Sequence, residues 1–155
     1  MSTPSSLDLL NPRPWASRRR VPAGAIADTI DKWSQELIIA ASNRDWTNPS
    51  LRRITPDFRA EFEHSNGIPI NSWAEYRGIH EGIAADFPDY RFQTLDGVAE
   101  VDEKRGTGAV WLLLRVEGHP KDQVRESIIV FNWRCTDETW VCYKQKVVRG
   151  MLWDA

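Results

Sequence analysis

The stretch VRESIIVFNWR, residues 124–134, decides the fold of this chain. Taken at a period of two, it predicts a β-strand rich in aliphatic and aromatic side chains. Glu126 shares one face of this strand with Ile128 and Val130, because alternate residues of a strand point to the same side. A carboxylate is therefore expected among aliphatic neighbours in the middle of a sheet, and it needs either a partner or a function.

The neighbouring stretches predict three more strands of the same sheet. RFQTLDGVAEVD (91–102), GAVWLLLRVEG (108–118) and TWVCYKQKVVRG (139–150) alternate in the same way. Short loops around residues 104–106, 118–121 and 137–138 join the four strands. Strands joined by short turns pair antiparallel, so the C-terminal half is predicted to be an antiparallel sheet.

The N-terminal half predicts helices. Ile26, Ile30, Trp33, Leu37 and Ala41 recur at helical spacing, which indicates a long amphipathic helix that ends near residues 43–50. Two short helices are predicted over residues 50–54 and 56–62. A further helix is predicted to begin at a Ser72 and Glu75 capping box and to stop at Phe87, before Pro88.

Helices followed by an antiparallel sheet predict an α+β domain in which about three N-terminal helices cover one face of the sheet. The chain has 155 residues, which fits one domain over residues 25–155 preceded by a loose arm over residues 1–24. Its net charge of -2 comes from interspersed acids and bases, which excludes nucleic acid and membrane surfaces as expected partners.

Other features of the sequence limit the location and the kind of catalysis that can be expected of this chain. No apolar run is long enough to span a bilayer and no signal peptide is visible, so a cytoplasmic location is expected. Cys135 and Cys142 lack the spacing of a zinc or redox motif, and no nucleotide-binding loop is present. Neither a metal nor a cofactor is therefore expected, and any catalysis should proceed by general acid/base chemistry.

Two turns set the predicted register of the sheet. A two-residue turn at Asp137 and Glu138 sets Asn132 opposite Tyr143, Val130 opposite Gln145 and Glu126 opposite Arg149. A loop of about six residues before the third strand sets Arg115 opposite Glu126. One face then carries a mixed polar and aromatic set: Trp111, Arg115, Glu126, Asn132, Tyr143, Gln145 and Arg149.

We expect the helices to cover this acid-bearing face. In the predicted register Lys144 and Lys146 share the opposite face with Val110, Ile129 and Trp133, and lysines at strand centres require water. That opposite face should look outward and offer its aromatic side chains to a second subunit, giving a homodimer. The acid-bearing face should then line a small-molecule pocket.

Two interpretations of Glu126 remain open. In the first, Glu126 is a structural ion pair with Arg115 or Arg149. In the second, Glu126 is a carboxylate in a dry cavity that moves a proton on a bound ligand. His80 on the inward stripe of its helix and His64 before a turn are the candidate proton partners, although each is also compatible with a structural role.

The order of elements resembles the nuclear transport factor 2-like superfamily, and more narrowly its SnoaL-like branch of polyketide cyclases and small fungal isomerases. The resemblance covers roughly residues 25–151 and is carried by RRITPDFRAEF, by DFPDYRF at the end of a helix, and by VAEVDEKRGTGAVWLLLRVEG, SIIVFNWR and TWVCYKQKVVRGM. It implies a cone-shaped α+β barrel, in which a curved sheet wraps around a cavity closed by helices. SnoaL-type cyclases carry an acid near the end of the last strand, where this chain has KVVRG, so the acid expected to act is Glu126.

The resemblance implies a cofactor-independent isomerase, cyclase or dehydratase. Its substrate would be an apolar polycyclic polyketide, terpenoid or alkaloid intermediate of secondary metabolism. The expected catalytic residues are Glu126, His80, His64 and Arg115, and the expected substrate-binding residues are Trp73, Tyr76, Trp111, Asn132, Tyr143 and Arg149. The alternatives are an epoxide hydrolase, in which Asp86 or Asp96 joins Glu126, and a non-catalytic dimeric binding module.

Overall fold

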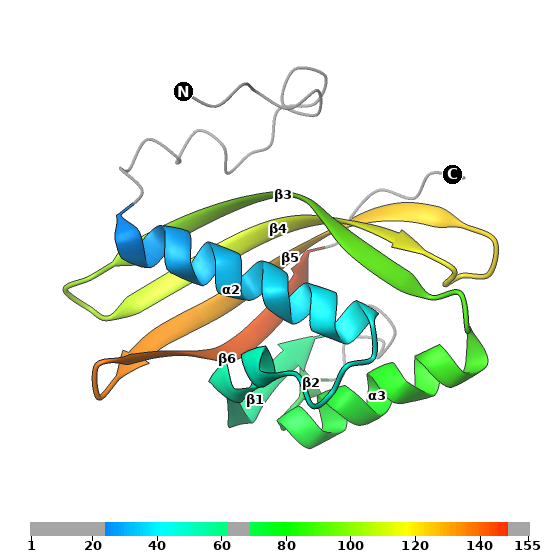
Figure 1. Ribbon diagram of the computed structural model, residues 1–155, viewed down its shortest axis with the longest axis horizontal. Helices are drawn as coiled ribbons and strands as arrows, with labels where there is room; N and C mark the ends of the chain where they lie inside the picture. Colours follow the sequence, from blue (N-terminus) through cyan, green and yellow to red (C-terminus); the bar gives the residue numbers. More distant parts are fainter. Residues whose placement is uncertain (1–23, 62–68, 149–155) are drawn as a thin grey trace, which may run out of the picture.

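The alternating stretches of the sequence form one six-stranded sheet with the strand order β2-β1-β6-β5-β4-β3. The computed structural model describes residues 24–61 and 69–148. The sheet is curved and does not close, since β2 and β3 are its two edges (Figure 1). The strands are β1 (Ile54–Glu61), β2 (Pro69–Ile70), β3 (Arg91–Asp102), β4 (Thr107–Glu117), β5 (Val124–Thr136) and β6 (Thr139–Val148).

Within residues 24–61 and 69–148, two α-helices and one short 3-10 helix complete the α+β fold, whose class is confirmed. They are α2 (Ala25–Ser42), η2 (Pro49–Arg53) and α3 (Trp73–Asp86). The predicted capping box begins α3, because the backbone N–H of Glu75 donates to Ser72 Oγ at 3.1 Å. Within the described ranges no helix is long and apolar enough to cross a membrane.

The helix predicted over residues 56–62 is wrong. Residues 54–61 form strand β1, in which Phe58 and Ala60 are buried and alternate with exposed Arg59 and Glu61. Pro56 suggested a first helical turn, but it lies in the irregular part of β1, between the residues that pair with β6. A proline is tolerated in a strand where no ladder hydrogen bond is required of its nitrogen.

The register predicted between β4 and β5 is confirmed. Arg115 lies opposite Glu126, Leu113 opposite Ile128, and Trp111 opposite Val130.

The last hairpin departs from its predicted register at a β-bulge. The two-residue turn is as predicted, and pairing follows it from Thr136 opposite Thr139 to Trp133 opposite Cys142. Asn132 then pairs with Lys144, which leaves Tyr143 as one extra residue on β6. Because successive side chains of a strand alternate, this one-residue shift moves every later residue of β6 to the face opposite the predicted one.

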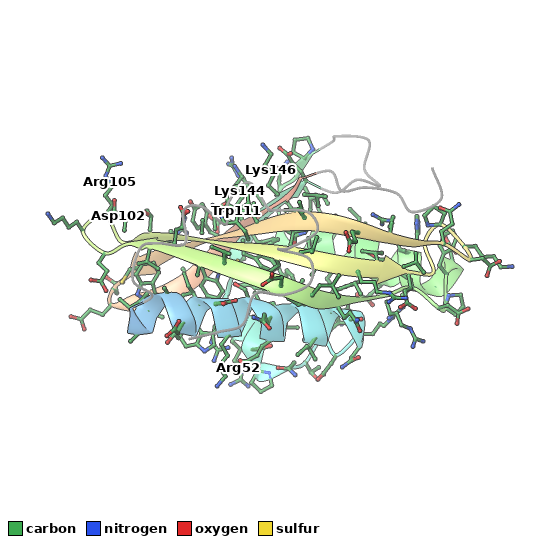
Figure 2. The ribbon with its side chains drawn as sticks, turned by 90° about the horizontal axis from the view of Figure 1, so that it is seen from above. Arg52, Asp102, Arg105, Trp111, Lys144 and Lys146 are labelled. Carbon is green, nitrogen blue, oxygen red and sulfur yellow. The ribbon has the colours of Figure 1, made fainter. Side chains whose placement is uncertain are left out.

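The bulge corrects the assignment of the two sheet faces. Lys144 and Lys146 point away from α2, together with Trp111 (Figure 2). The inner face, which the helices cover, instead carries the apolar set Val110, Leu112, Leu114, Ile129, Phe131 and Trp133, all of which belong to the buried core. The prediction that the helices cover the face of Glu126 is therefore wrong: Glu126 lies on the outer face.

Helix α2 is fixed on the inner face by one buried hydrogen bond and one close approach. The indole Nε1–H of Trp133 donates to Ser34 Oγ at 2.9 Å, and both residues are fully buried. A Cβ atom at Gly108 would lie 2.8 Å from Ile30 Cδ1, so glycine allows α2 to approach β4. The helix therefore meets the sheet through direct contact and through a specific polar pair.

We predict that Ser34→Ala lowers the free energy of unfolding by about 1–3 kcal/mol, because it leaves the buried Trp133 N–H without this acceptor. Urea unfolding followed by tryptophan fluorescence measures the change. Lys32→Ala, an exposed substitution on the same helix, is the control and should change stability by less than about 0.5 kcal/mol. Equal stability of Ser34→Ala and the wild type would contradict this account of the junction.

Candidate functional site

A small pocket of about 50 Å³ lies between α3 and the inner face of the sheet. Its wall combines apolar side chains with a few polar ones, as in many ligand sites. The lining residues are Ile38, Tyr76, His80, Tyr90, Phe92, Leu114, Val116, Arg125, Ser127, Ile129, Gln145 and Val147.

Helix α3 brings Tyr76 and His80 to this pocket. The two residues are four apart, so they lie on one face of the helix, one turn from each other. Each is 5% exposed, and their ring centroids are 4.7 Å apart in an edge-to-face arrangement. The sequence predicted this inward stripe of α3, and the burial of both residues confirms it.

His80 lies within a group of aromatic rings. Its ring centroid is 6.0 Å from that of Trp46, 5.7 Å from that of Phe92 and 6.3 Å from that of Tyr90. The imidazole is thus a titratable group held among aromatic rings at the wall of the pocket.

Three polar side chains from the two central C-terminal strands complete the wall. Gln145 on β6 accepts a hydrogen bond at its Oε1 from the Tyr76 hydroxyl at 2.5 Å, and both residues are buried. Arg125 on β5 is 4% exposed, and its Nε–H donates to the His119 carbonyl oxygen at 3.1 Å. Ser127 follows Arg125 on the same face and is also buried.

Burial changes the acidity of two groups at or near this pocket. Desolvation raises the pKa of Tyr76 well above its ordinary value of 10.0, with smaller contributions from Tyr90 and Cys142. Desolvation also raises the pKa of the Cys142 thiol above its ordinary value of 9.0. Tyr76 is therefore a neutral hydrogen-bond donor at physiological pH, and Cys142 is a protonated thiol.

The predicted site residues are divided between the two faces of the sheet. His80 and Tyr76 line the pocket. Trp73 stacks on Tyr76, with ring centroids 5.2 Å apart, and it belongs to the second layer behind the pocket wall.

Four predicted residues, Trp111, Arg115, Glu126 and Asn132, lie on the outer face, so the expectation that they line the cavity is wrong. The prediction put Lys144 and Lys146 on the face opposite these residues and turned that face outward; because the bulge moves both lysines to the outer face, the face without Glu126 is the one that meets the helices. Arg115 there forms an ion pair with Glu117, with Nε and Oε1 3.1 Å apart.

Three further predicted residues are accounted for differently. Tyr143 is the bulged residue of β6, and the guanidinium of Arg134 lies 4.8 Å from its ring centroid. His64, Arg149 and residues 1–23 of the arm predicted over residues 1–24 lie outside the described residues.

Sequence reasoning missed Arg125, Ser127 and Tyr90 as pocket residues, and it put Gln145 on the wrong face. A signal was present: Arg125 and Ser127 precede Ile129 at a period of two, on the most apolar face of the sheet. A charged residue in such a position is as unusual as the acid on the other face.

Two larger hollows lie at the surface. The first, of about 750 Å³, lies between the C-terminal part of α2 and β3 and is lined in part by Arg44, Arg91 and Arg115. The second, of about 560 Å³, borders the loop between β4 and β5. Their side chains are largely exposed or half-buried, with Phe92 the buried exception. Buried polar groups converge only on the smaller pocket among these three, and we therefore take it as the candidate site.

Across residues 24–61 and 69–148, no group of three or more His, Cys, Asp or Glu side chains is arranged to hold a metal ion.

No protein family model matches the chain, and no curated protein matches it in sequence. Solved structures do share its fold. An uncharacterized protein with a cystatin-like fold from Caulobacter vibrioides has a TM-score of 0.68 at 13% identity, covering 85% of this chain and 94% of that one. An NTF2-like protein of unknown function from Pseudomonas putida has a TM-score of 0.64 at 12% identity, covering 79% and 85%.

The association domain of CaMKII from C. elegans is a third similar structure, with a TM-score of 0.61 at 15% identity, covering 79% of this chain and 95% of that one. Identities at this level indicate a common fold and leave activity open. The chain therefore has a cystatin-like, NTF2-like fold, as the superfamily resemblance predicted.

We predict that stability falls as the pH rises above about 9. The pKa values of Cys142 and Tyr76 are raised in the folded state, so the unfolded chain loses these protons first and is favoured at high pH. Each group lowers the free energy of unfolding by up to about 1.4 kcal/mol per pH unit between its unfolded and folded pKa.

Urea unfolding at pH 8 and at pH 10.5 tests this dependence. Cys142→Ala and Tyr76→Phe should each reduce the loss of stability between the two pH values. Cys135→Ala, which removes an exposed thiol, is the control and should retain the wild-type loss. If neither buried substitution reduces the loss, other groups govern the alkaline dependence.

Proposed function

We propose that this chain is a cofactor-independent enzyme of the isomerase or lyase class, and that His80 is its acid/base residue. The observation that carries the proposal is a buried imidazole at the wall of a pocket, four residues after a buried tyrosine on the same helix. Histidine is the side chain whose ordinary pKa suits proton transfer near neutral pH.

The reaction would move one proton. His80 takes a proton from a carbon next to a carbonyl group, the electron pair of the C–H bond moves into an enolate, and the imidazolium returns the proton at a second carbon. Gln145 and Tyr76 supply polar groups at the same wall, where an oriented donor stabilises charge that develops on the enolate oxygen. No redox step or external group is required for this sequence.

The size of the pocket bears on the substrate. Pockets for drug-sized ligands measure about 300–1,000 Å³, whereas this pocket measures about 50 Å³. A polycyclic substrate of the SnoaL-like branch would therefore require side chains to move, and a compact substrate fits the pocket as it stands. An epoxide hydrolase pairing Glu126 with Asp86 or Asp96 is disfavoured, because none of the three lines the pocket.

We predict that the wild-type protein catalyses exchange of carbon-bound hydrogen for deuterium in D2O on members of a library of small carbonyl compounds, both neutral and acidic. His80→Gln should slow this exchange by about 100-fold or more, the usual contribution of a positioned acid/base group. Mass spectrometry of the recovered compounds measures the exchange, and circular dichroism checks that the variant is folded.

Glu126→Gln is the matched control, since it changes a titratable residue on the outer face of the sheet. Its exchange rate should equal that of the wild type. The reverse result, with Glu126→Gln inactive and His80→Gln active, would overturn the proposed role of His80 and restore the carboxylate as the acting group.

A second candidate function is self-association through the outer face. The observation that favours it is the similarity to domains described as an association domain and as hubs, with TM-scores of 0.61 to 0.63. The outer face presents the half-buried indole of Trp111 on the same side of the sheet as Lys144 and Lys146 (Figure 2). A central aromatic residue with a charged rim is typical of protein interfaces.

On this second proposal we predict that the wild type is a dimer in sedimentation equilibrium and that Trp111→Ala raises the dissociation constant at least 10-fold, as expected of an aromatic residue at an interface centre. Ile39→Ala is the control, because Ile39 is 58% exposed on α2, away from the outer face. A monomeric wild type at all accessible concentrations would rule out this mode of association.

A further inference from the structure

We propose that the edge strand β3 binds an extended segment of a partner protein in which acidic and apolar residues alternate. The binding site is the surface hollow of about 750 Å³ between the C-terminal part of α2 and β3. Among the described residues, Phe92 is the one that this hollow shares with the pocket of His80. Three features carry the assignment: an open stretch of strand edge, a local excess of positive charge, and exposed apolar side chains.

One backbone amide on the edge of β3 is open to pairing. The N–H of Phe92 points away from β4, because it donates to Ser42 Oγ on α2 at 3.0 Å. Since the backbone groups of an antiparallel strand alternate in direction, the N–H and C=O of Thr94 also point away from β4. Further along, the N–H of Gly97 donates to Asp96 Oδ1 at 2.8 Å. Between these two bonded amides, the Thr94 N–H has no acceptor within residues 24–61 and 69–148, so a strand can add there.

The hollow carries an excess of positive charge. Its lining combines one carboxylate with three guanidinium groups, those of Glu117 and of Arg44, Arg91 and Arg115. Arg44 donates to two backbone carbonyl groups, which holds its charge beside the end of α2. Even with a partial negative charge of about one half at the helix C-terminus, the net charge of the hollow stays above about +1. The whole chain carries a net charge of -2, so this excess is local, and it favours an acidic partner.

Arg91 and Arg115 can turn toward a ligand, because both are exposed. The ion pair of Arg115 with Glu117 has side chains that are 46% and 41% exposed, and an exposed pair of this kind contributes little to stability. Arg115 can therefore exchange Glu117 for a carboxylate of a partner at small cost. Neither Arg44 nor Arg91 forms an ion pair with another described residue.

Exposed apolar side chains lie at the same place. Within the part of the chain that the structure describes, the exposed large hydrophobic residues are Ile39 and Leu95, at 58% and 41%. Ile39 lines the hollow, and Leu95 directly follows Thr94 at the bulge of β3. Single exposed hydrophobic residues are common on protein surfaces, but two of them beside one open strand edge favour a contact surface.

The two faces of β3 determine the pattern of the partner segment. Phe92 belongs to the buried core, so its neighbour Arg91 points to the outer face, on the side of Arg115. Ile39 lies on the side of α2. Because successive side chains of an added strand point to opposite faces, its outer residues should be acidic and its inner ones apolar. A second copy of this chain fits less well, since pairing two β3 strands brings like-charged arginines together.

Fluorescence anisotropy of the full chain with labelled ten-residue peptides at pH 7 tests the proposal. The probes are a peptide of alternating Glu and Val, a peptide of alternating Lys and Val, and a peptide of five Glu followed by five Val. The alternating acidic peptide should bind at least about 10-fold more tightly than either of the other two, because only it matches both the charge and the two faces of the edge.

Variants locate the binding on β3. The double substitution Arg91→Gln and Arg115→Gln should weaken binding of the alternating acidic peptide at least about 10-fold. The matched control is Arg105→Gln, which removes an arginine whose side chain is 83% exposed beyond the far end of β3 and should leave binding unchanged. Thr94→Pro should also weaken binding, because it removes the outward N–H, and an edge strand tolerates proline at such a position.

Hydrogen exchange on the wild type keeps the test decisive if Thr94→Pro does not fold, as circular dichroism would reveal. The Thr94 amide should exchange more slowly when the alternating acidic peptide is added, and an unchanged rate overturns strand addition. Equal binding of the Glu and Lys peptides also overturns the proposal. So does binding that needs the arginines but not the alternation, which would indicate a site for anions in general. A dimer that Thr94→Pro dissociates in sedimentation equilibrium would assign this edge to a second copy of the chain instead.

Discussion

One extra residue in the last strand, Tyr143, decides which side chains in the second half of β6 face the helices. Before the bulge, the side chains of β6 alternate as the turn at Asp137 requires, and after it the alternation is reversed. Without the bulge, Lys144 and Lys146 would lie on the face that packs against α2, where two unpaired ammonium groups would each cost several kcal/mol. With it, both lysines reach solvent and Gln145 turns inward.

The same change of face in β6 also places one of the polar residues of the pocket wall. Gln145 meets the hydroxyl of Tyr76 on α3, so the far end of β6 is tied to the second helix by a buried hydrogen bond. Arg125 and Ser127 share the inner face with the core residues of β5 and form the remaining polar wall. The hydrogen bond between Trp133 and Ser34 holds α2 against the opposite part of that face. Polar groups thus lie at one end of an otherwise apolar interior, which is how a binding site is kept within a stable core.

The two proposed functions lie on opposite faces of the sheet. The inner face holds buried groups that suit a ligand and a proton transfer, and the outer face holds Trp111 among charged side chains that suit a protein surface. Because neighbouring residues of a strand point to opposite faces, a substitution on one face leaves the other largely intact. The solved structures that share the fold include an association domain and a protein of unknown function, so the fold by itself selects neither proposal.

The sequence by itself determined the class of the fold, helices α2 and α3, four of the six strands and the register of β4 against β5, because periodicity, capping residues and turn residues are local. It also identified Tyr76 and His80 as an inward pair. Only the tertiary structure decided which face of the sheet meets the helices, since a bulge depends on how two strands fit each other and leaves no pattern within either strand. That choice of face excluded Glu126 from the pocket and brought in Arg125. The tertiary structure also decided that residues 54–61, in which Thr55 and Pro56 indicated a helix, form a strand, because they pair in parallel with β6.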